Sequence, residues 1–482
     1  MRVLLLNPPF IKNFMRNARW AVVGISGSEW YPIYLGYCTG LLERWGHHPK
    51  LLDAQNRGFT HEQTYQIAKE FEPELLVLYF STASLDNDIE VGKKIKDLTG
   101  CQVVMVGPWA SIYPKKTLKK AKNIDMLAEG EFDFTVLEIA KGVPKSKIKG
   151  LYYKKGKKII KNPPRLPVPE EELDKFPFVT DVYRRHLNIW DYHQTGHQYP
   201  FVDLFTGRGC SWGLCTFCLW PNTINKGAGY RKRSIENVIE ELRFIKREMP
   251  YIKEVFFQDD TLPKERAIEI SEAIIKNNLK ICWSGYSRAN LDFETLKLMK
   301  RAGCRTLHVG YESGDLKILQ AIRKGTTPQM AERFTYDAAK AGIFIVADFI
   351  TGLPHESVET IKKTTEWARR LPVQRYTITL PKPYPMTPFY NWLKKNKYIN
   401  QKGEINYPNL SWEEINKWNR WSLKRVYFSW NYFIRMITEP YEWGRIFRSA
   451  LFFIPYLFSK TKQIEYGGFY KNEKYPSKNK NC

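Results

Sequence analysis

Three cysteines within nine residues decide how this chain is interpreted. Residues 207–218 read Gly-Arg-Gly-Cys-Ser-Trp-Gly-Leu-Cys-Thr-Phe-Cys, which places Cys210, Cys215 and Cys218 in a C-x4-C-x2-C pattern. The stretch follows a strand-like run at 199–205 and begins a loop. Three thiolates on one short loop can bind three irons of a 4Fe–4S cluster and leave the fourth iron open to a ligand. The pattern therefore predicts a reactive iron–sulfur site.

A structural zinc ion is the alternative for the same cysteines. Zinc takes four ligands, and His193 or His197 is available as the fourth, but the sequence has no second C-x2-C or H-x3-H pair. A disulfide is less favoured, because the clustered cysteines are odd in number and the other five are scattered. The spacing favours the cluster over zinc.

The cysteine loop resembles that of the radical S-adenosylmethionine (SAM) superfamily, whose usual pattern is C-x3-C-x-aromatic-C. Phe217 takes the aromatic position, and one extra residue separates Cys210 from Cys215. The resemblance implies that the three cysteines hold the cluster, that SAM chelates the open iron, and that its reductive cleavage gives a 5′-deoxyadenosyl radical. It also implies an electron donor of the ferredoxin or flavodoxin type and anaerobic chemistry.

Length and composition predict two or three packed domains in a reducing compartment. The chain has 482 residues, 43% of them hydrophobic, and eight cysteines without an even framework. The apolar run at the start is too short for a signal peptide, and no stretch reaches the ~18 apolar residues of a membrane-spanning helix. We expect a cytoplasmic protein, with peripheral contact at the inner membrane surface as an option.

The net charge of +25 indicates a basic surface. Such a surface suits nucleic acid, anionic lipid or an acidic protein, and lysine-rich compositions are also usual in proteins of heat-loving organisms. No common nucleic-acid-binding module is recognisable. Nucleic acid is therefore the least favoured partner.

Residues 1–140 alternate strand and helix patterns. Strands are predicted at 3–6, 49–52, 75–79, 103–106 and 126–128, with helices at 34–45, 62–71, 88–98 and 115–122. This rhythm predicts a doubly wound parallel sheet, in which ligands bind at the carboxyl ends of the strands. A generic nucleotide-binding domain is less favoured, because no G-x-G-x-x-G follows the first strand.

Together with the cysteine loop, this region resembles the cobalamin-binding domain of cobalamin-dependent radical SAM enzymes. Residues 31–36 and 46–53 are similar to that family's N-terminal signature. The resemblance implies a Rossmann-like cobalamin domain whose strand-end loops contact cobalamin, and no protein histidine on cobalt. These loops contribute Asn7, Pro8, Pro9, Asp53, Ala54, Ser81, Thr82, Ser84, Gly107, Pro108, Trp109, Glu129 and Gly130.

Residues 141–197 read as a basic connector with a hairpin at 145–161, and residues 198–395 as a second strand–helix series. Six strands are predicted at 199–205, 254–257, 280–283, 306–309, 344–349 and 375–379, and Ser234 is expected to cap a helix at 235–247. Parallel strands of this kind gather functional groups at their carboxyl ends. The series resembles the radical SAM (β/α)6 partial barrel.

By that resemblance, polar residues at the strand ends contact SAM. Gln258, Asp259 and Asp260 stand where the family binds the SAM amino group, although Asp259 and Asp260 also suit helix capping. Arg288 is a candidate for the SAM carboxylate or the substrate. The remaining contacts are expected at the ribose and the adenine, from Glu312, Ser313, Gly352, Leu353 and Pro354.

Residues 396–482 are aromatic and basic. Helical spacing runs from 412 to 437, and 447–458 is a second apolar piece, ahead of a polar, lysine-rich tail that reads as disordered. Such helices suit a cap over the barrel or an interfacial helix on an anionic membrane. We expect a C-terminal helical domain.

The function predicted for this α/β chain is cobalamin-dependent radical SAM C-methylation. A methyl group would pass from methylcobalamin to an unactivated carbon of a lipid-like or otherwise large apolar substrate, or of a protein. A non-methylating radical reaction, such as oxidative cyclisation or ring rearrangement, is the first alternative. A non-catalytic cobalamin or cluster sensor is the second.

Overall fold

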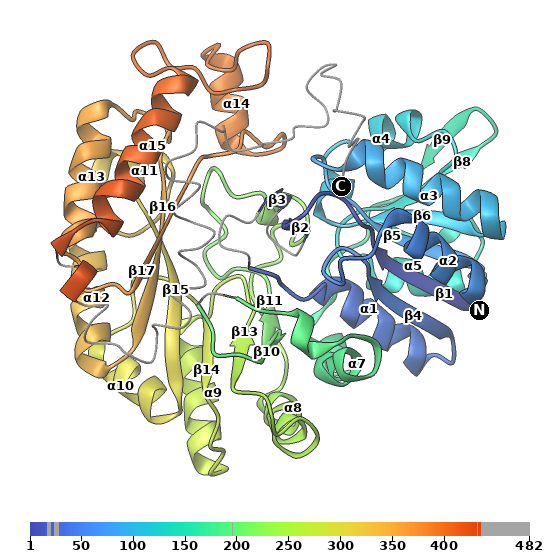
Figure 1. Ribbon diagram of the computed structural model, residues 1–482, viewed down its shortest axis with the longest axis horizontal. Coiled ribbons are helices and arrows are strands. Elements are labelled where there is room, and N and C mark those ends of the chain that lie inside the picture. The colour runs from blue at the N-terminus through green and yellow to red at the C-terminus, as the bar shows by residue number, and fades with distance from the viewer. Residues whose placement is uncertain (17–20, 24–27, 195, 431, 435–482) are drawn as a thin grey trace.

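Two large sheets organise the chain. The computed structural model describes residues 1–16, 21–23, 28–194, 196–430 and 432–434. Within these residues a seven-stranded sheet and a six-stranded sheet lie side by side, the first in the blue-to-cyan half of the chain and the second in the green-to-orange half (Figure 1). The α/β fold class is confirmed.

The first sheet has the order β4-β1-β5-β6-β7-β8-β9. Its parallel part comprises β1 (Arg2–Asn7), β4 (His48–Asp53), β5 (Leu75–Tyr79), β6 (Gln102–Val106) and β7 (Met126–Ala128), and the hairpin β8 (Leu151–Lys155) and β9 (Lys158–Lys161) extends it antiparallel. Apolar side chains on both faces of β1 are fully buried, as a sheet covered on both sides requires. The strand order reverses between β1 and β5, which is the switch point where such sheets bind ligands.

Helices cover both faces of this sheet. Alternate β1 residues pack into two different cores, one with α1 (Ile33–Arg44) and α5 (Asp133–Ala140), the other with α2 (His61–Phe71), α3 (Leu85–Thr99) and α4 (Pro114–Lys120). An unpredicted hairpin, β2 (Phe14–Arg16) with β3 (Ala21–Val23), follows β1 and lies toward the second sheet in Figure 1.

The second sheet is parallel, with its strands in sequence order. It comprises β10 (Phe201–Leu204), β13 (Glu254–Phe257), β14 (Trp283–Ser287), β15 (Cys304–Glu312), β16 (Phe344–Ile350) and β17 (Arg375–Thr379). The short strands β11 (Gly207–Arg208) and β12 (Arg231–Lys232) pair across the cysteine loop. This is the six-strand arrangement that the sequence predicts.

Helices follow the strands of the second sheet. They are α8 (Ile235–Glu248), α9 (Lys264–Lys276), α10 (Phe293–Arg301), α11 (Leu316–Ala321), α12 (Pro328–Ala341), α13 (Val358–Arg370) and α14 (Pro388–Lys395). Ser234 caps α8 as predicted, its hydroxyl accepting from the Asn237 amide. The third strand was wrongly predicted at 280–283: it begins at Trp283, because residues 277–282 turn back from α9 before the chain enters the sheet.

The segment between the sheets contains α6 (Glu170–Leu173) and α7 (Val179–His186). After the second sheet, α15 (Trp412–Tyr427) packs on α13 and β17. Helical structure beyond residue 434, including the predicted piece at 447–458, lies outside the described residues. None of the helices in the described ranges is long and apolar enough to cross a bilayer. The boundaries expected at 140, 197 and 395 stay predictions.

Candidate functional site

The cysteine loop lies at the carboxyl end of β10 and is held by neighbouring turns. The Thr216 amide donates to the Ile322 carbonyl at 3.0 Å, and the Thr216 carbonyl accepts from the Phe389 amide at 3.0 Å. The Cys210 sulfur accepts from the Gly213 amide at 3.5 Å. All three cysteines are partly exposed, so the thiols are within reach of a cofactor.

Trp212 lies between Cys210 and Cys215, in the part of the cysteine pattern that is one residue longer than usual. Its indole Nε1 donates to the Arg323 carbonyl at 2.8 Å, and its ring lies against Gly325. A Cβ on Gly325 would stand 2.1 Å from that ring, and the φ of +71° at Gly325 also favours glycine. The longer loop therefore carries an aromatic side chain that fastens it to the turn after α11.

Phe217 anchors the other half of the loop. Its ring packs against two apolar clusters, one containing Leu353 and α11 residues, the other containing Phe389 and α15 residues. The aromatic position of the motif thus connects the cysteine loop to the loop that follows β16. A direct contact between Phe217 and SAM stays a prediction.

Two cations lie beside Cys215. The Arg288 guanidinium is close enough to Cys215 for each to shift the pKa of the other, and it sits 4.5 Å from the centre of the Trp212 ring. Burial raises the pKa of Cys215, while the positive charges of Lys324 and Arg288 lower it. Burial, with the nearby Cys215 thiolate, raises the pKa of Cys218 to about 12. Positive charge at this position favours thiolate, the form that binds metal.

The histidines proposed as zinc ligands occupy other places. His197 lies before β10, at the opposite end of the strand from the cysteines, and its Nδ1 is 3.1 Å from Glu254. His193 Nδ1 is 3.8 Å from Glu29. Among the residues that the structure describes, no three His, Cys, Asp or Glu side chains are grouped to hold a single metal ion.

Gln258 is the residue at the end of β13 best suited to bind a ligand. Its side chain is 1% exposed, and neither its amide nitrogen nor its amide oxygen has a hydrogen-bond partner within the described chain. An unpartnered buried amide is costly, which a bound ligand would relieve. Thr216 Oγ1 in the cysteine loop is buried and unpartnered in the same way.

The two aspartates after Gln258 already have protein partners. Asp259 is fully buried and accepts from the Thr206 amide at 2.7 Å, the Thr206 hydroxyl and the Tyr230 hydroxyl. These bonds fasten the start of the cysteine loop, so the geometry favours a structural role for Asp259. Asp260 accepts from Asn225 Nδ2 at 2.6 Å.

The predicted ribose and adenine contacts fall into two groups. The Glu312 carboxylate binds Lys324 Nζ at 2.7 Å, and Ser313 lies 3.2 Å from the Thr364 hydroxyl. Gly352, Leu353 and Pro354 form a buried turn closed by Glu356, which accepts from the Gly352 and Leu353 amides. Glu312 thus contacts the turn that follows α11 and holds the cysteine loop. Ser313 instead links the end of β15 to α13 through Thr364.

The loops after β1, β4, β5, β6 and β7 lie at one edge of the first sheet, and we call them the shelf. The shelf is built around Arg16, a residue that the sequence alone did not single out. Its guanidinium is fully buried and bonds Asn7 Oδ1 at 3.0 Å, Ser84 Oγ at 2.8 Å, Asp88 at 2.8 Å and the Pro8 carbonyl. These partners lie at the end of β1, in the loops after β1 and β5 and in the first turn of α3, so Arg16 occupies the switch point of the sheet. No local pattern signalled it, because it arrives on a hairpin.

Asp53 lies at the same edge. It accepts from Asn7 Nδ2 at 2.7 Å and from the Tyr192 hydroxyl at 2.9 Å, and burial raises its pKa to about 6. The Ala54 amide donates to the Asn7 carbonyl, and the Pro9 carbonyl accepts from Asn87. The loops after β1 and β4 are thereby joined.

The remaining shelf residues line the ends of β5, β6 and β7. The Ser81 and Ser84 hydroxyls are 2.8 Å apart, and Thr82 between them is partly exposed. Gly107 has a φ of +117°, and a Cβ there would meet the Tyr79 ring at 3.1 Å. Pro108 and Trp109 are buried, Glu129 is bound by Lys226 and Tyr152, and Gly130 donates to Ser111.

Residues 208–231, which include the cysteine loop, contact the shelf directly. Lys226 binds Glu129 at 3.0 Å, Arg208 binds Asp133 at 2.9 Å and Arg231 binds Glu131 at 2.8 Å. The Trp109 ring lies 5.3 Å from that of Tyr384, which follows β17. The strand-end loops of the first sheet are therefore in contact with the segment that carries the cysteines.

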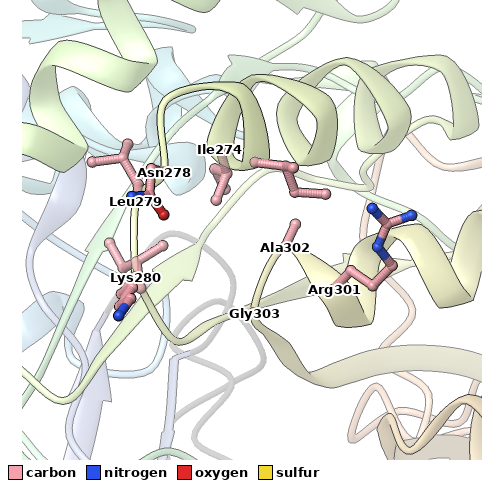
Figure 2. A pocket seen from close by; sticks show the side chains of 9 residues that line it. Ile274, Asn278, Leu279, Lys280, Arg301, Ala302 and Gly303 are labelled. Atoms are coloured by element: carbon pink, nitrogen blue, oxygen red, sulfur yellow. The ribbon is translucent and has the colours of Figure 1, made fainter.

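The hollow in Figure 2 lies away from these residues. It is lined by Asn278–Ile281 after α9 and by Arg301–Gly303 before β15. Those residues lie at the amino ends of β14 and β15, whereas the cysteine loop follows the carboxyl end of β10. The hollow contains no residue of the candidate site.

Comparisons with known proteins agree with this geometry. Residues 204–368 match the radical SAM superfamily. An uncharacterized methyltransferase of Pyrococcus horikoshii is 32% identical over 408 residues, which cover 83% of this chain and 84% of that protein. The cytidylyl-2-hydroxyethylphosphonate methyltransferase of Streptomyces wedmorensis is 26% identical, over 70% of this chain and 73% of that protein.

A solved structure shares the two-sheet fold. The radical SAM methyltransferase TsrM of Kitasatospora setae, solved with cobalamin and a 4Fe–4S cluster bound, has a TM-score of 0.64 at 18% identity, over 82% of this chain and 78% of that one. The chain belongs to the radical SAM superfamily of enzymes and has the fold of its cobalamin-dependent members.

Proposed function

We propose that this chain is a cobalamin-dependent radical SAM methyltransferase that methylates an unactivated carbon. The observation that carries the proposal is the meeting of the cysteine loop with the strand-end shelf of the first sheet through residues 208–231. The similarity to two methyltransferases adds support. A substrate held between the two sheets would face both cofactors.

The residues present fit the proposed cofactors. Cys210, Cys215 and Cys218 would hold the cluster, and the unpartnered amide of Gln258 would bind SAM. The shelf around Asn7, Asp53 and Gly107 would hold cobalamin. When bound, the cluster with SAM supplies radical chemistry and cobalamin supplies a methyl group.

The chain's own contribution is positioning and exclusion of water. Asp259 and Trp212 fix the two ends of the first half of the loop, and Arg16 and Asp53 hold the shelf. Abstraction of hydrogen from an sp3 carbon by a radical needs no general base. His197, before β10, and His308, on β15, are both buried and have no part in this proposal.

We propose that the substrate is either a lipid-like molecule or a protein side chain. Phe428, Trp430 and Phe433 are exposed just after α15, which supports contact with an apolar substrate or an anionic membrane. Pelleting with phosphatidylglycerol vesicles at low salt tests the membrane contact. Binding that is lost in Trp430→Ala supports it, and no binding removes it.

The electron donor is proposed to dock at the cysteine loop. Ser211 is exposed and Leu214 is 55% exposed, and Trp212 between them bonds the carbonyl of the exposed Arg323. An exposed apolar side chain with a nearby cationic residue suits an acidic ferredoxin or flavodoxin. Leu214→Asp should slow reduction of the cluster by such a protein but not by dithionite; equal slowing by both would contradict the docking site.

The deciding experiment begins with anaerobic purification in the presence of cobalamin, followed by iron, sulfide, zinc and cobalt analysis. About four irons and one cobalt per chain are expected. With reductant, SAM and substrate, a methyltransferase forms 5′-deoxyadenosine and a methylated product. 5′-Deoxyadenosine without methylation would indicate a cyclase-like reaction, neither product would indicate a sensor, and zinc without iron would refute the cluster.

A further inference from the structure

The turn at 322–325 accepts hydrogen bonds from residues on both sides of Cys215 in the sequence. Ile322 accepts from the Thr216 amide at 3.0 Å, one residue after Cys215, and Arg323 accepts from the Trp212 indole at 2.8 Å, three residues before it. The carbonyl of Lys324 accepts from Arg288 at 2.6 Å. One backbone bond and two side-chain bonds to the carbonyls of this turn therefore hold Lys324 near this cysteine.

The charge of Lys324 is buried and has one acidic partner. Its Nζ is 2.7 Å from Glu312 Oε1, and the two side chains are only 10% and 9% exposed. Glu312 and Arg323 both adopt left-handed backbone, with φ of +64° and +53°. Such conformations persist in non-glycine residues only where the surroundings enforce them. The backbone at Glu312 and at Arg323, which precedes Lys324, is therefore held in place by its surroundings.

A buried charge acts strongly on a neighbouring redox centre. Screening is weak away from solvent, and the potential of an iron–sulfur cluster depends on nearby charge and exposure. Reduction adds negative charge to the cluster. A fixed cation beside one ligand stabilises the reduced form, and a fixed carboxylate opposes it.

We propose that Lys324 and Glu312 form a charge pair that sets the reduction potential of the cluster held by the three cysteines. Lys324 raises the reduction potential of the cluster and Glu312 lowers it. The two residues act through their fixed charges and not as a catalytic acid or base. The inference rests on the proposed cluster site and deepens it. A buried ion pair is by itself weak evidence for a stabilising role.

The test is an anaerobic redox titration of the reconstituted full-length protein, without SAM, cobalamin or substrate, followed by electron paramagnetic resonance. Glu312→Gln should shift the potential to a less negative value. Glu312→Gln with Lys324→Met should shift it back to a more negative value than Glu312→Gln alone. Comparing these two variants avoids an unpaired buried carboxylate.

The exposed lysine of α11 provides the control, and Lys317→Met should leave the potential unchanged. A purely structural pair predicts no shift, or shifts in the same direction, and either result overturns the inference. If the double variant does not retain iron, the sign of the Glu312→Gln shift decides. A wild-type protein that assembles no cluster would instead overturn the proposed function.

Discussion

At the scale of single residues, the fit of Trp212 against Gly325 makes a direct prediction. Gly325→Ala adds a Cβ 2.1 Å from the indole, so we expect about 1–3 kcal/mol of destabilisation from overpacking beyond the backbone cost. Iron retained per chain should also fall. Denaturant unfolding and iron analysis measure both.

Gly142→Ala is the matched control. Gly142 has a similar φ, +73°, with nothing within 4 Å of its added Cβ. It should show only the backbone cost, about 1 kcal/mol, and normal iron content. Equal losses in the two variants would contradict the role given to the indole contact.

Glu356 predicts a pH dependence of stability. Burial raises its pKa to about 7 from 4.5, against the two backbone amides that lower it. The folded protein therefore holds this proton more tightly than the unfolded chain, and the stabilisation present below pH 4.5 is lost as the pH rises to about 7. Glu356→Gln should flatten that part of the profile, on the order of 3 kcal/mol at most.

Urea unfolding at pH 5 and pH 8 checks this. The difference in unfolding free energy between the two pH values should be smaller in Glu356→Gln than in the wild type. An unchanged difference would mean that Glu356 is ionised in the folded protein throughout this range.

Residues that form a recognisable spacing pattern can be predicted from the sequence. Residues whose role depends on contacts with distant parts of the chain cannot. The cysteine trio and Gln258 could be named from local pattern and strand ends. Arg16 and Lys324 could not, because the partners of Arg16 lie up to 72 residues away and Glu312, the partner of Lys324, lies 12 residues away on the far side of α11. The structural work of Asp259, which holds Thr206 and Tyr230, was equally invisible locally.

At the scale of elements, the hairpin β2–β3 matters because it delivers Arg16 to the switch point. Arg16→Met would leave Asp88 buried without its cation, and we expect a loss of about 3–5 kcal/mol in unfolding free energy. Adding Asp88→Asn removes the stranded charge and should restore part of that loss. Urea unfolding measures both, and an additive further loss in the double variant would contradict the pairing.

Strands were predictable where apolar runs were bounded by turn residues. β5, β13 and β17 begin and end as the pattern predicts. The third strand of the second sheet was displaced, because Trp283–Ser287 contains Ser284 and Gly285 and reads as weakly apolar. Its residues are buried by tertiary packing, Trp283 against Phe257, rather than by local preference.

At the scale of the whole molecule, buried arginines join the two sheets. Arg208, 3% exposed, pairs with Asp133 at the start of α5, which covers the first sheet. Arg208→Met should cost about 3–5 kcal/mol, because it leaves a buried carboxylate unpaired. Lys226→Met breaks the more exposed bridge to Glu129 and should cost no more than about 1 kcal/mol. Denaturant unfolding compares them, and equal costs would show that Arg208 does not join the sheets.

Residues 208–231 also impose an order on biosynthesis. They include the loop that carries the cysteines, and in the described part of the chain their arginines pair with the carboxylates of Glu131 and Asp133, which are synthesised earlier. Domains generally fold as units during synthesis, the N-terminal one first, so Glu131 and Asp133 are in place before Arg208 and Arg231 are synthesised. A chain beginning at residue 198 would lack both carboxylates and leave the two arginines unpaired. The proposed cluster would then have to assemble on a loop without these contacts.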